Sequence, residues 1–191
     1  MEPAYKLLTV EEFLDSRPND QQHYQLIDGV IVAMAAAATP HQVIAGRLGG
    51  EVYASLNATR PECFLRAQAG IAPRGLQGRD HFETDLTVSC TPLDRDDRGI
   101  VPDPVLIVEV LSPSTDRDDF FVKLPAYQQI PSLQEILYLE TERVGATVNR
   151  RTESDWQTIE FTGPDARLRL ETVGLDIGLG SLYRGIPELS P

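Results

Sequence analysis

The feature that most constrains this chain is an acidic residue inside a run of branched aliphatic residues. Residues 105–111 read VLIVEVL, which places Glu109 in an otherwise apolar segment. A continuous apolar run of this length is typical of a strand that is buried on both faces of a sheet. An ionised carboxylate there costs on the order of several kcal/mol unless a cation or hydrogen-bond donors meet it. We therefore expect a cationic or hydrogen-bonding partner for Glu109.

Lysine is rare in the chain, and one lysine follows the Glu109 strand closely. Of the 17 basic residues, only Lys6 and Lys123 are lysines. Lys123 comes about one loop and one helical turn after Glu109. Asp85, a second carboxylate, belongs to another expected strand over residues 82–88. Two strand carboxylates with a nearby lysine predict a divalent-metal site for phosphodiester chemistry.

The three residue types suit that chemistry. Magnesium prefers oxygen ligands and usually takes one or two protein carboxylates, which Asp85 and Glu109 could supply. Water bound to such an ion is a better nucleophile. A lysine beside it, here Lys123, can orient that water or offset charge in the transition state.

Structural roles for the same residues are open alternatives at this point. Asp85 could be an ordinary aspartate at the end of a strand, and Glu109 with Lys123 could form a purely structural ion pair. Lys123 also lies one helical turn from Asp119 and from Tyr127, and this polar stripe could be a solvated helix face.

Composition indicates one soluble globular domain of 191 residues, with 41% hydrophobic and 24% charged residues. No apolar run approaches the roughly 18 residues of a membrane-spanning helix. The first residues, MEPAY, show no basic segment before an apolar core, so no secretory signal is expected. The net charge of −12 argues against a simple nucleic-acid binder unless the acidic residues cluster away from the site or metal ions offset them.

Cys63 and Cys90 are the chain's two cysteines, and no metal-ligand spacing such as CxxC connects them. Disulfides are rare in the reducing cytoplasm. We therefore expect two buried thiols in a cytoplasmic protein rather than a disulfide.

Local patterns divide the N-terminal part into a short helix, a hairpin and a long helix. Thr9 and Glu12 match a capping box, and the helix they open should end before Pro18, because proline disfavours helical geometry in the residue before it. Residues 24–32 predict a β-hairpin on a tight Asp-Gly turn. Apolar residues at helical spacing over residues 41–56 predict an amphipathic helix.

The segment after the Glu109 strand predicts a helix over residues 116–130, with residues 112–115, SPST, ending the strand and supplying caps. Pro125 conflicts with a long helix, because a proline deep in a helix costs about 3 kcal/mol. The conflict disappears if the regular helix begins near Phe121 or Val122, which leaves Pro125 in the first turn.

Most remaining segments read as strands of one mixed sheet. Asp85, Thr87 and Ser89 alternate with apolar residues, a pattern that puts Asp85 on the more polar face of its strand. The other expected strands cover residues 64–71, 105–111, 136–139, 146–149, 157–161 and 167–171, of which the last three form a closing antiparallel set. The chain thus reads as one α/β domain over residues 1–191.

Two segments are close to known family signatures. Residues 24–29 read YQLIDG, near YELIDG, and residues 104–115 read PVLIVEVLSPST, near PDLVVEVLSPST. Through these segments, the pair His41-Gln42 and the strand at residues 135–139, the chain resembles the Uma2 family, also called DUF820. That resemblance implies a restriction-endonuclease-like PD-(D/E)xK core, a mixed β-sheet flanked by helices. An N-terminal helix and hairpin and C-terminal antiparallel strands would be added to this core.

The resemblance also implies a set of site residues. Asp85 and Glu109 would be metal carboxylates, with the carbonyl of Val110 completing the ligand set around Mg²⁺ or Mn²⁺. Lys123 would be the catalytic lysine, carried on the next helix because Leu111 occupies the lysine position of the usual ExK triplet. Gln25 stands where the family has an accessory glutamate, and its neutral amide removes one negative charge. The surrounding residues would be His41, Asp119 and Tyr127.

The resulting hypothesis is a cytoplasmic, magnesium-dependent endonuclease that hydrolyses phosphodiester bonds in DNA, as a homodimer by analogy with the family. The alternative is a degenerate nuclease fold that binds nucleic acid or protein, which Gln25 and the acidic charge favour. A third possibility is a sugar or small-molecule hydrolase that uses Asp85 and Glu109 as paired carboxylates. It would need a cleft lined with aromatic residues, and the chain has one tryptophan, Trp156.

Overall fold

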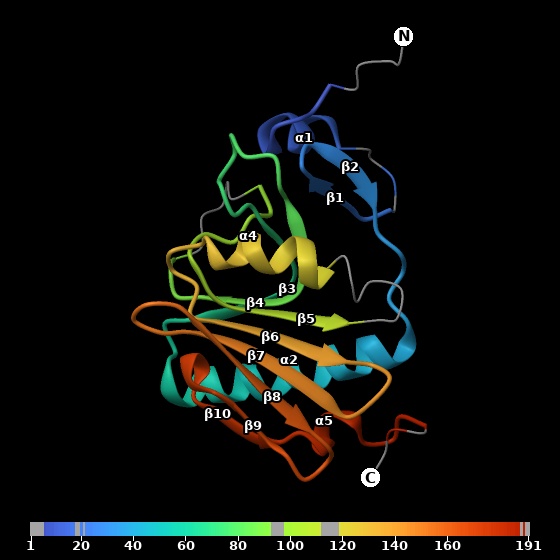
Figure 1. The fold of residues 1–191 in the computed structure, drawn as a ribbon, viewed down its shortest axis with the longest axis vertical. Helices are drawn as coiled ribbons and strands as arrows, with labels where there is room; N and C mark the ends of the chain where they lie inside the picture. Colours follow the sequence, from blue (N-terminus) through green and yellow to red (C-terminus); the bar gives the residue numbers. More distant parts are fainter. Residues whose placement is uncertain are drawn as a thin grey trace.

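A six-stranded mixed sheet forms the centre of the molecule in the computed structural model (Figure 1). The structure describes residues 6–17, 20, 22–92, 98–111, 119–187 and 189, with the backbone alone for Asp119 and Phe120. The strand order is β3-β4-β5-β6-β7-β8, in which β5 and β6 run parallel and the other neighbours antiparallel. The strands are β3 (Phe64–Ile71), β4 (Phe82–Ser89), β5 (Pro104–Leu111), β6 (Glu135–Glu140), β7 (Gly145–Arg151) and β8 (Trp156–Thr162). The predicted α/β fold with a mixed sheet is confirmed.

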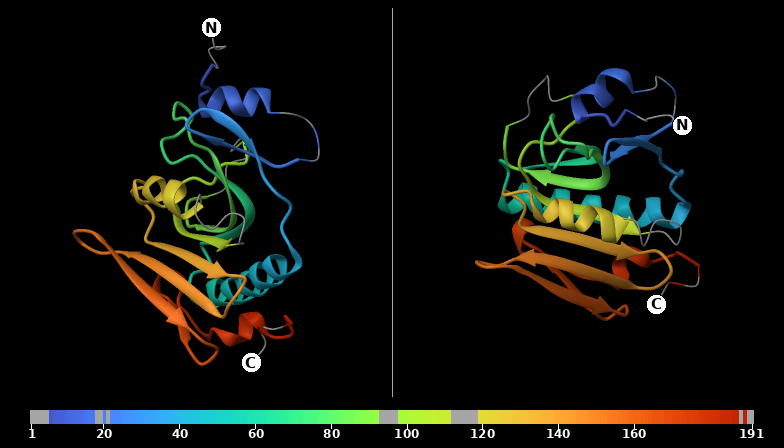
Figure 2. Two further views of the ribbon diagram at one scale, coloured as in Figure 1. Left: turned by 45° about the vertical axis from the view of Figure 1, so that its right-hand side comes forward. Right: turned by 45° about the horizontal axis from the view of Figure 1, so that its top comes forward.

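Helices cover both faces of this sheet (Figures 1 and 2). On one face lies α2 (Thr39–Thr59), whose buried residues share a core with Leu106, Val108 and Val110 of β5. On the other face lies α4 (Leu124–Gln128), which packs through Tyr127 near Ile107. Strand β5 is therefore buried on both sides, as its continuous apolar run predicted.

The predicted N-terminal elements are present. Helix α1 (Val10–Ser16) begins with the expected capping box, in which Thr9 and Glu12 bond each other's backbone N–H groups. Strands β1 (Tyr24–Ile27) and β2 (Val30–Ala33) form the hairpin, and its turn residues both have positive φ, as a tight Asp-Gly turn requires. Leu26 and His81 form a bridge that places β1 beside the start of β4.

The helix after β5 differs from a regular α-helix. A π-helical segment, η1 (Asp119–Lys123), leads directly into α4, and Pro125 lies in the first turn of α4 as predicted. The expected beginning of this helix at residues 116–118 and the predicted caps at residues 112–115 lie outside the described residues.

The C-terminal strands do not form one closing set. The segments predicted at residues 146–149 and 157–161 extend the central sheet as β7 and β8. The segment at residues 167–171 instead becomes β9 (Arg167–Leu170), which pairs with β10 (Leu175–Gly178) in a separate sheet. A 3-10 turn, η2 (Glu171–Val173), joins these two strands, and α5 (Gly180–Tyr183) follows β10.

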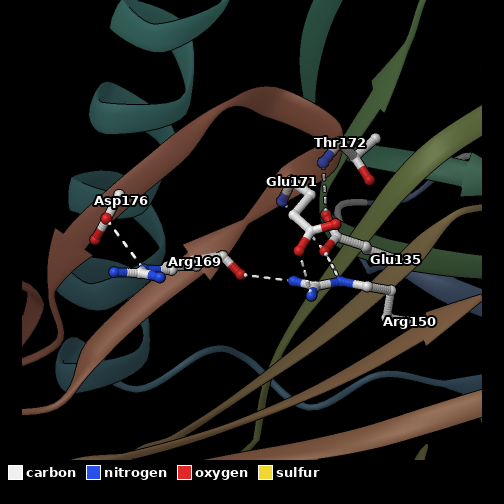
Figure 3. A network of polar contacts seen from close by, with 6 residues as sticks. All are labelled: Glu135, Arg150, Arg169, Glu171, Thr172 and Asp176. Atoms are coloured by element: carbon white, nitrogen blue, oxygen red, sulfur yellow. Dashed lines mark hydrogen bonds and ion pairs between the residues drawn. The ribbon is translucent and has the colours of Figure 1, made fainter.

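Figure 3 shows how a buried carboxylate attaches this C-terminal unit to the sheet. Glu135, at the start of β6, accepts hydrogen bonds from Arg150 Nε at 2.8 Å, from the Glu171 N–H at 3.2 Å and from the Thr172 N–H at 2.9 Å. Arg150 also donates to the carbonyl of Arg169 at 3.1 Å. A buried charge is tolerated here because one cation and two backbone donors meet it.

The expectation of two free thiols is wrong. Cys63 and Cys90 form a disulfide with a Cα–Cα distance of 4.0 Å. They directly flank the Phe64–Ser89 pair of the β3–β4 ladder, so antiparallel pairing brings them together across a sequence separation of 27 residues. Short-range cysteine spacing carries no information about such a cross-strand contact.

The polar side of β4 is more buried than alternation suggested. Thr87 and Ser89 are fully buried, and their hydroxyls are used inside the protein. Ser89 donates to the carbonyl of Pro102 at 2.7 Å, and the Thr84 and Thr87 hydroxyls lie 2.6 Å apart. Asp85 keeps partial exposure on this strand.

No helix among the described residues combines the length and the apolar character that crossing a bilayer requires.

His81 is buried where β1 meets β4. Its ring packs so closely on Gly70 that a Cβ added to this glycine would lie 2.4 Å from His81 Nε2. Burial, with a smaller contribution from the charge of Arg17, lowers the pKa of His81 to about 4. Between the ordinary histidine pKa of 6.5 and this value, the unfolded chain binds a proton that the folded protein does not. The free energy of unfolding should therefore decrease as the pH falls through this window.

We expect the free energy of unfolding, measured with urea, to fall between pH 7.5 and pH 4.5 by about 2 kcal/mol more in wild type than in His81→Gln. One pKa unit corresponds to about 1.4 kcal/mol. An equal loss in the two proteins would show that His81 does not cause the acid sensitivity.

Candidate active site

Glu109 projects from β5 toward α4 and is met there by a cation and a hydroxyl. The Nζ atom of Lys123 lies 3.2 Å from Glu109 Oε1, and the hydroxyl of Tyr127 donates to the same oxygen at 2.6 Å. Only 5% of the Glu109 side chain and 3% of the Lys123 side chain are exposed. The partner predicted for the buried carboxylate is thus Lys123, and the solvated-face alternative is excluded for Lys123 and Tyr127.

The chain after β5 positions these two partners by its local geometry. Lys123 is the last residue of η1 and Tyr127 comes four residues later, so both side chains lie on the same helix face. The Tyr127 ring is fully buried and meets Phe82 edge to face, with a centroid distance of 5.5 Å and an interplanar angle of 87°. This packing leaves the Tyr127 hydroxyl fixed on Glu109.

Asp85 lies where β4 and β5 stop pairing. The ladder between them ends at Leu86 and Val108, so the same register would place Asp85 opposite Glu109. In place of a further backbone bond, Asp85 Oδ2 accepts from the Val110 N–H at 2.7 Å. The carboxylate therefore fills the gap between the strands, immediately beside the backbone of Glu109.

His41, in the first turn of α2, also reaches Asp85. Its Nε2 lies 3.1 Å from Asp85 Oδ2, and the exposed fractions of the two side chains are 15% and 21%. Asp85 is thus the more open of the two carboxylates, while Glu109 is enclosed. The enclosed Glu109 and the more open Asp85 therefore form a polar site with limited access to solvent.

The remaining predicted residues are placed differently. Gln25, on β1, is buried, and its Oε1 accepts no hydrogen bond among the described residues. No hydrogen bond in that part of the chain joins Gln25 to Asp85 or Glu109. The side chain of Asp119 lies outside the described residues, and a metal-binding role for the Val110 carbonyl stays a prediction.

Comparison with known proteins establishes the family. A family model named Uma2 and described as "Putative restriction endonuclease" matches residues 10–180. The chain belongs to the Uma2 family.

Two relatives agree with this assignment. An uncharacterized protein, slr1290, of Synechocystis sp. (strain PCC 6803) is 28% identical over 180 residues, covering 94% of this chain and 93% of the relative. A solved structure from Anabaena variabilis ATCC 29413, described as "a putative nuclease belonging to DUF820", has a TM-score of 0.74 at 17% identity, covering 92% of this chain and 97% of the other. The second likeness confirms the fold.

The donor set of the Uma2 site fits a hard, hydrated cation. Within the described residues, no three histidine, cysteine, aspartate or glutamate side chains gather in a group that could hold a metal ion. Asp85 and Glu109 supply two carboxylates, and magnesium commonly takes one or two of these and keeps several waters. The residues present therefore suit Mg²⁺ or Mn²⁺ better than a zinc-type site with three or four protein ligands.

Three contacts to the two carboxylates were not predicted from the sequence pattern. Tyr127 and His41 were expected near the site through the family resemblance alone, and no pattern indicated that each touches a carboxylate. The Val110 N–H was missed entirely, because only its carbonyl was considered. A signal for it would have required knowing where the β4–β5 ladder ends.

We expect Lys123→Met to lower the free energy of unfolding by about 3–5 kcal/mol, because it leaves the Glu109 carboxylate buried without its cation. The double variant Glu109→Gln/Lys123→Met should recover much of this loss, since no uncompensated charge remains. Urea unfolding in the presence of EDTA measures both values.

Lys6→Met is the matched control, because Lys6 pairs with Glu12 at the surface. Its effect should stay below about 1 kcal/mol. A Lys123→Met protein as stable as wild type would contradict a stabilising role for the buried pair.

Proposed function

We infer that this Uma2 protein is a metal-dependent endonuclease that hydrolyses phosphodiester bonds in DNA. The observation that carries this proposal is the enclosed Glu109–Lys123–Tyr127 cluster beside Asp85. An ion pair of purely structural origin needs no second carboxylate at the same strand junction. Nor does a structural aspartate need partial exposure next to an enclosed glutamate.

Each residue has a role in this proposal. Asp85 and Glu109, with the Val110 carbonyl, would hold Mg²⁺ or Mn²⁺. Such an ion supplies a bound water of lowered pKa and offsets charge on the phosphoryl group. Lys123 contributes a positive charge that can approach the phosphate oxygens. Tyr127 holds the Glu109 carboxylate in one orientation.

The acidic character of the chain shapes the expected mode of binding. A net charge of −12 gives little general attraction for phosphates, so contacts near Lys123 and the bound cation would have to supply it. A two-fold homodimer would present one site to each strand of a duplex.

A DNA substrate also favours a cytoplasmic location for the protein. The Cys63–Cys90 bond would meet reducing conditions there.

The direct test is cleavage of plasmid and single-stranded DNA in the presence of Mg²⁺ or Mn²⁺. We expect Lys123→Ala and Glu109→Gln each to reduce the cleavage rate at least about 100-fold, the usual cost of removing a charge that stabilises a transition state. EDTA should abolish cleavage by wild type.

Lys6→Ala controls for the loss of a lysine, because Lys6 lies in a surface ion pair. Circular dichroism of each variant shows that the fold is intact. Equal cleavage by wild type and both site variants would indicate a contaminating nuclease and would contradict the proposal.

A second candidate is a nuclease fold without activity that binds nucleic acid or protein. Gln25 favours it, because an amide occupies a buried position where the YELIDG signature has a carboxylate, and its Oε1 is unbonded among the described residues. A neutral group there weakens the attraction for a cation.

Titrations of Gln25→Glu and of wild type with Mg²⁺ answer two questions. The variant tests whether Gln25 lines the metal site, and the wild type separates the two candidate functions. If Gln25 lines the metal site, calorimetry should show about a tenfold gain in Mg²⁺ affinity in the variant. Unchanged affinity would remove Gln25 from the site. DNA binding by a wild-type protein that takes up no Mg²⁺ would favour the module without activity.

A further inference from the structure

The first turn of α2 approaches the strand junction from the face opposite α4. This turn contains Thr39, Pro40 and His41, and none of its residues is acidic. Negative charge is favourable near the N-terminus of a helix, where the backbone N–H groups have no partner within the helix. A carboxylate from another element meets this turn instead: Asp85 of β4 contacts His41.

Both contacts to the Asp85 carboxylate go to a single oxygen. Oδ2 lies 2.7 Å from the Val110 nitrogen and 3.1 Å from His41 Nε2. The Val110 N–H donates a hydrogen bond to Oδ2, and the His41 imidazole meets the same oxygen in a close N···O contact. Neither contact involves Oδ1.

Two contacts from different elements restrict the carboxylate more than one does. The last torsion of an aspartate is broad, with two nearly equivalent orientations of the carboxylate. A single bond from the Val110 N–H leaves room for the two oxygens to exchange places. A second contact from α2, a helix of 21 residues that packs on the sheet, opposes that exchange.

We propose that His41 is a positioning residue of the reaction centre. Together with the Val110 N–H it holds Oδ2 of Asp85, and this leaves Oδ1 as the oxygen offered to a divalent cation. The inference rests on the proposed function for the cation, while the hold on Asp85 is a property of the folded protein alone. Helix α2 thereby becomes part of the site without contacting substrate.

The test compares three full-length variants. His41→Leu removes the nitrogen that contacts Asp85, His41→Gln keeps a polar nitrogen at the end of the side chain, and His23→Leu is the matched control. His23 also contacts a carboxylate of β4, with 2.6 Å between its Nδ1 and Glu83 Oε2, but at the surface. Thermal unfolding identifies any variant whose fold is damaged.

Two measurements are made on each protein. Hydrogen exchange of the Val110 amide, followed by NMR without metal, reports the hold on Asp85. Calorimetric titration with Mn²⁺ alone reports cation binding. We expect His41→Leu to speed Val110 exchange and to weaken Mn²⁺ binding about 10- to 100-fold, the usual effect of losing a group that orients a ligand.

His41→Gln should recover most of both effects, and His23→Leu should behave as wild type. Unchanged Val110 exchange in His41→Leu, or equal losses in the leucine and glutamine variants, would overturn the inference. A wild-type protein that takes up no Mn²⁺ would instead contradict the proposed function, and Val110 exchange would then decide the role of His41 separately.

Discussion

The arrangement of this protein depends on one buried charge, the carboxylate of Glu109. Strand β5 is covered by α2 on one face and by α4 on the other, so water cannot solvate a charge at its centre. The ammonium of Lys123 and the hydroxyl of Tyr127 replace that water. Because these groups come from η1 and α4, the docking of these two elements against β5 brings them to Glu109. The site and the core on this face form together.

A second buried carboxylate in the same sheet shows what makes Glu109 different. Glu135 is met by the planar guanidinium of Arg150 and by two backbone N–H groups, all held rigidly by secondary structure. Guanidinium groups and backbone donors are typical of permanent ion pairs. Glu109 is met by a lysine and a tyrosine, and it has an open aspartate beside its backbone. Under the proposed function, Glu135 forms a structural link, whereas Glu109 belongs to a reactive arrangement.

Much of the fold was predictable because its signals are local. The capping box of α1, the positive-φ hairpin turn, the helical spacing of α2 and the buried run of β5 each depend on residues close in sequence. Lys123 was identified as the partner of Glu109 by scarcity and proximity. The disulfide and the separate pairing of β9 with β10 were not predictable, because they depend on which strands become neighbours. The contact between His41 and Asp85 also joins residues from distant segments.

The run of apolar residues around Glu109 already requires a buried charge in a central strand and a nearby cation to balance it. This follows from the cost of removing a carboxylate from water, whatever the detailed fold. The packing of the folded chain places Asp85 at the end of the β4–β5 ladder, with its Oδ2 on the Val110 N–H. It also brings His41 of α2 to the same oxygen. Ladder ends and helix docking are set by the packing of the whole core, and no short segment contains that information.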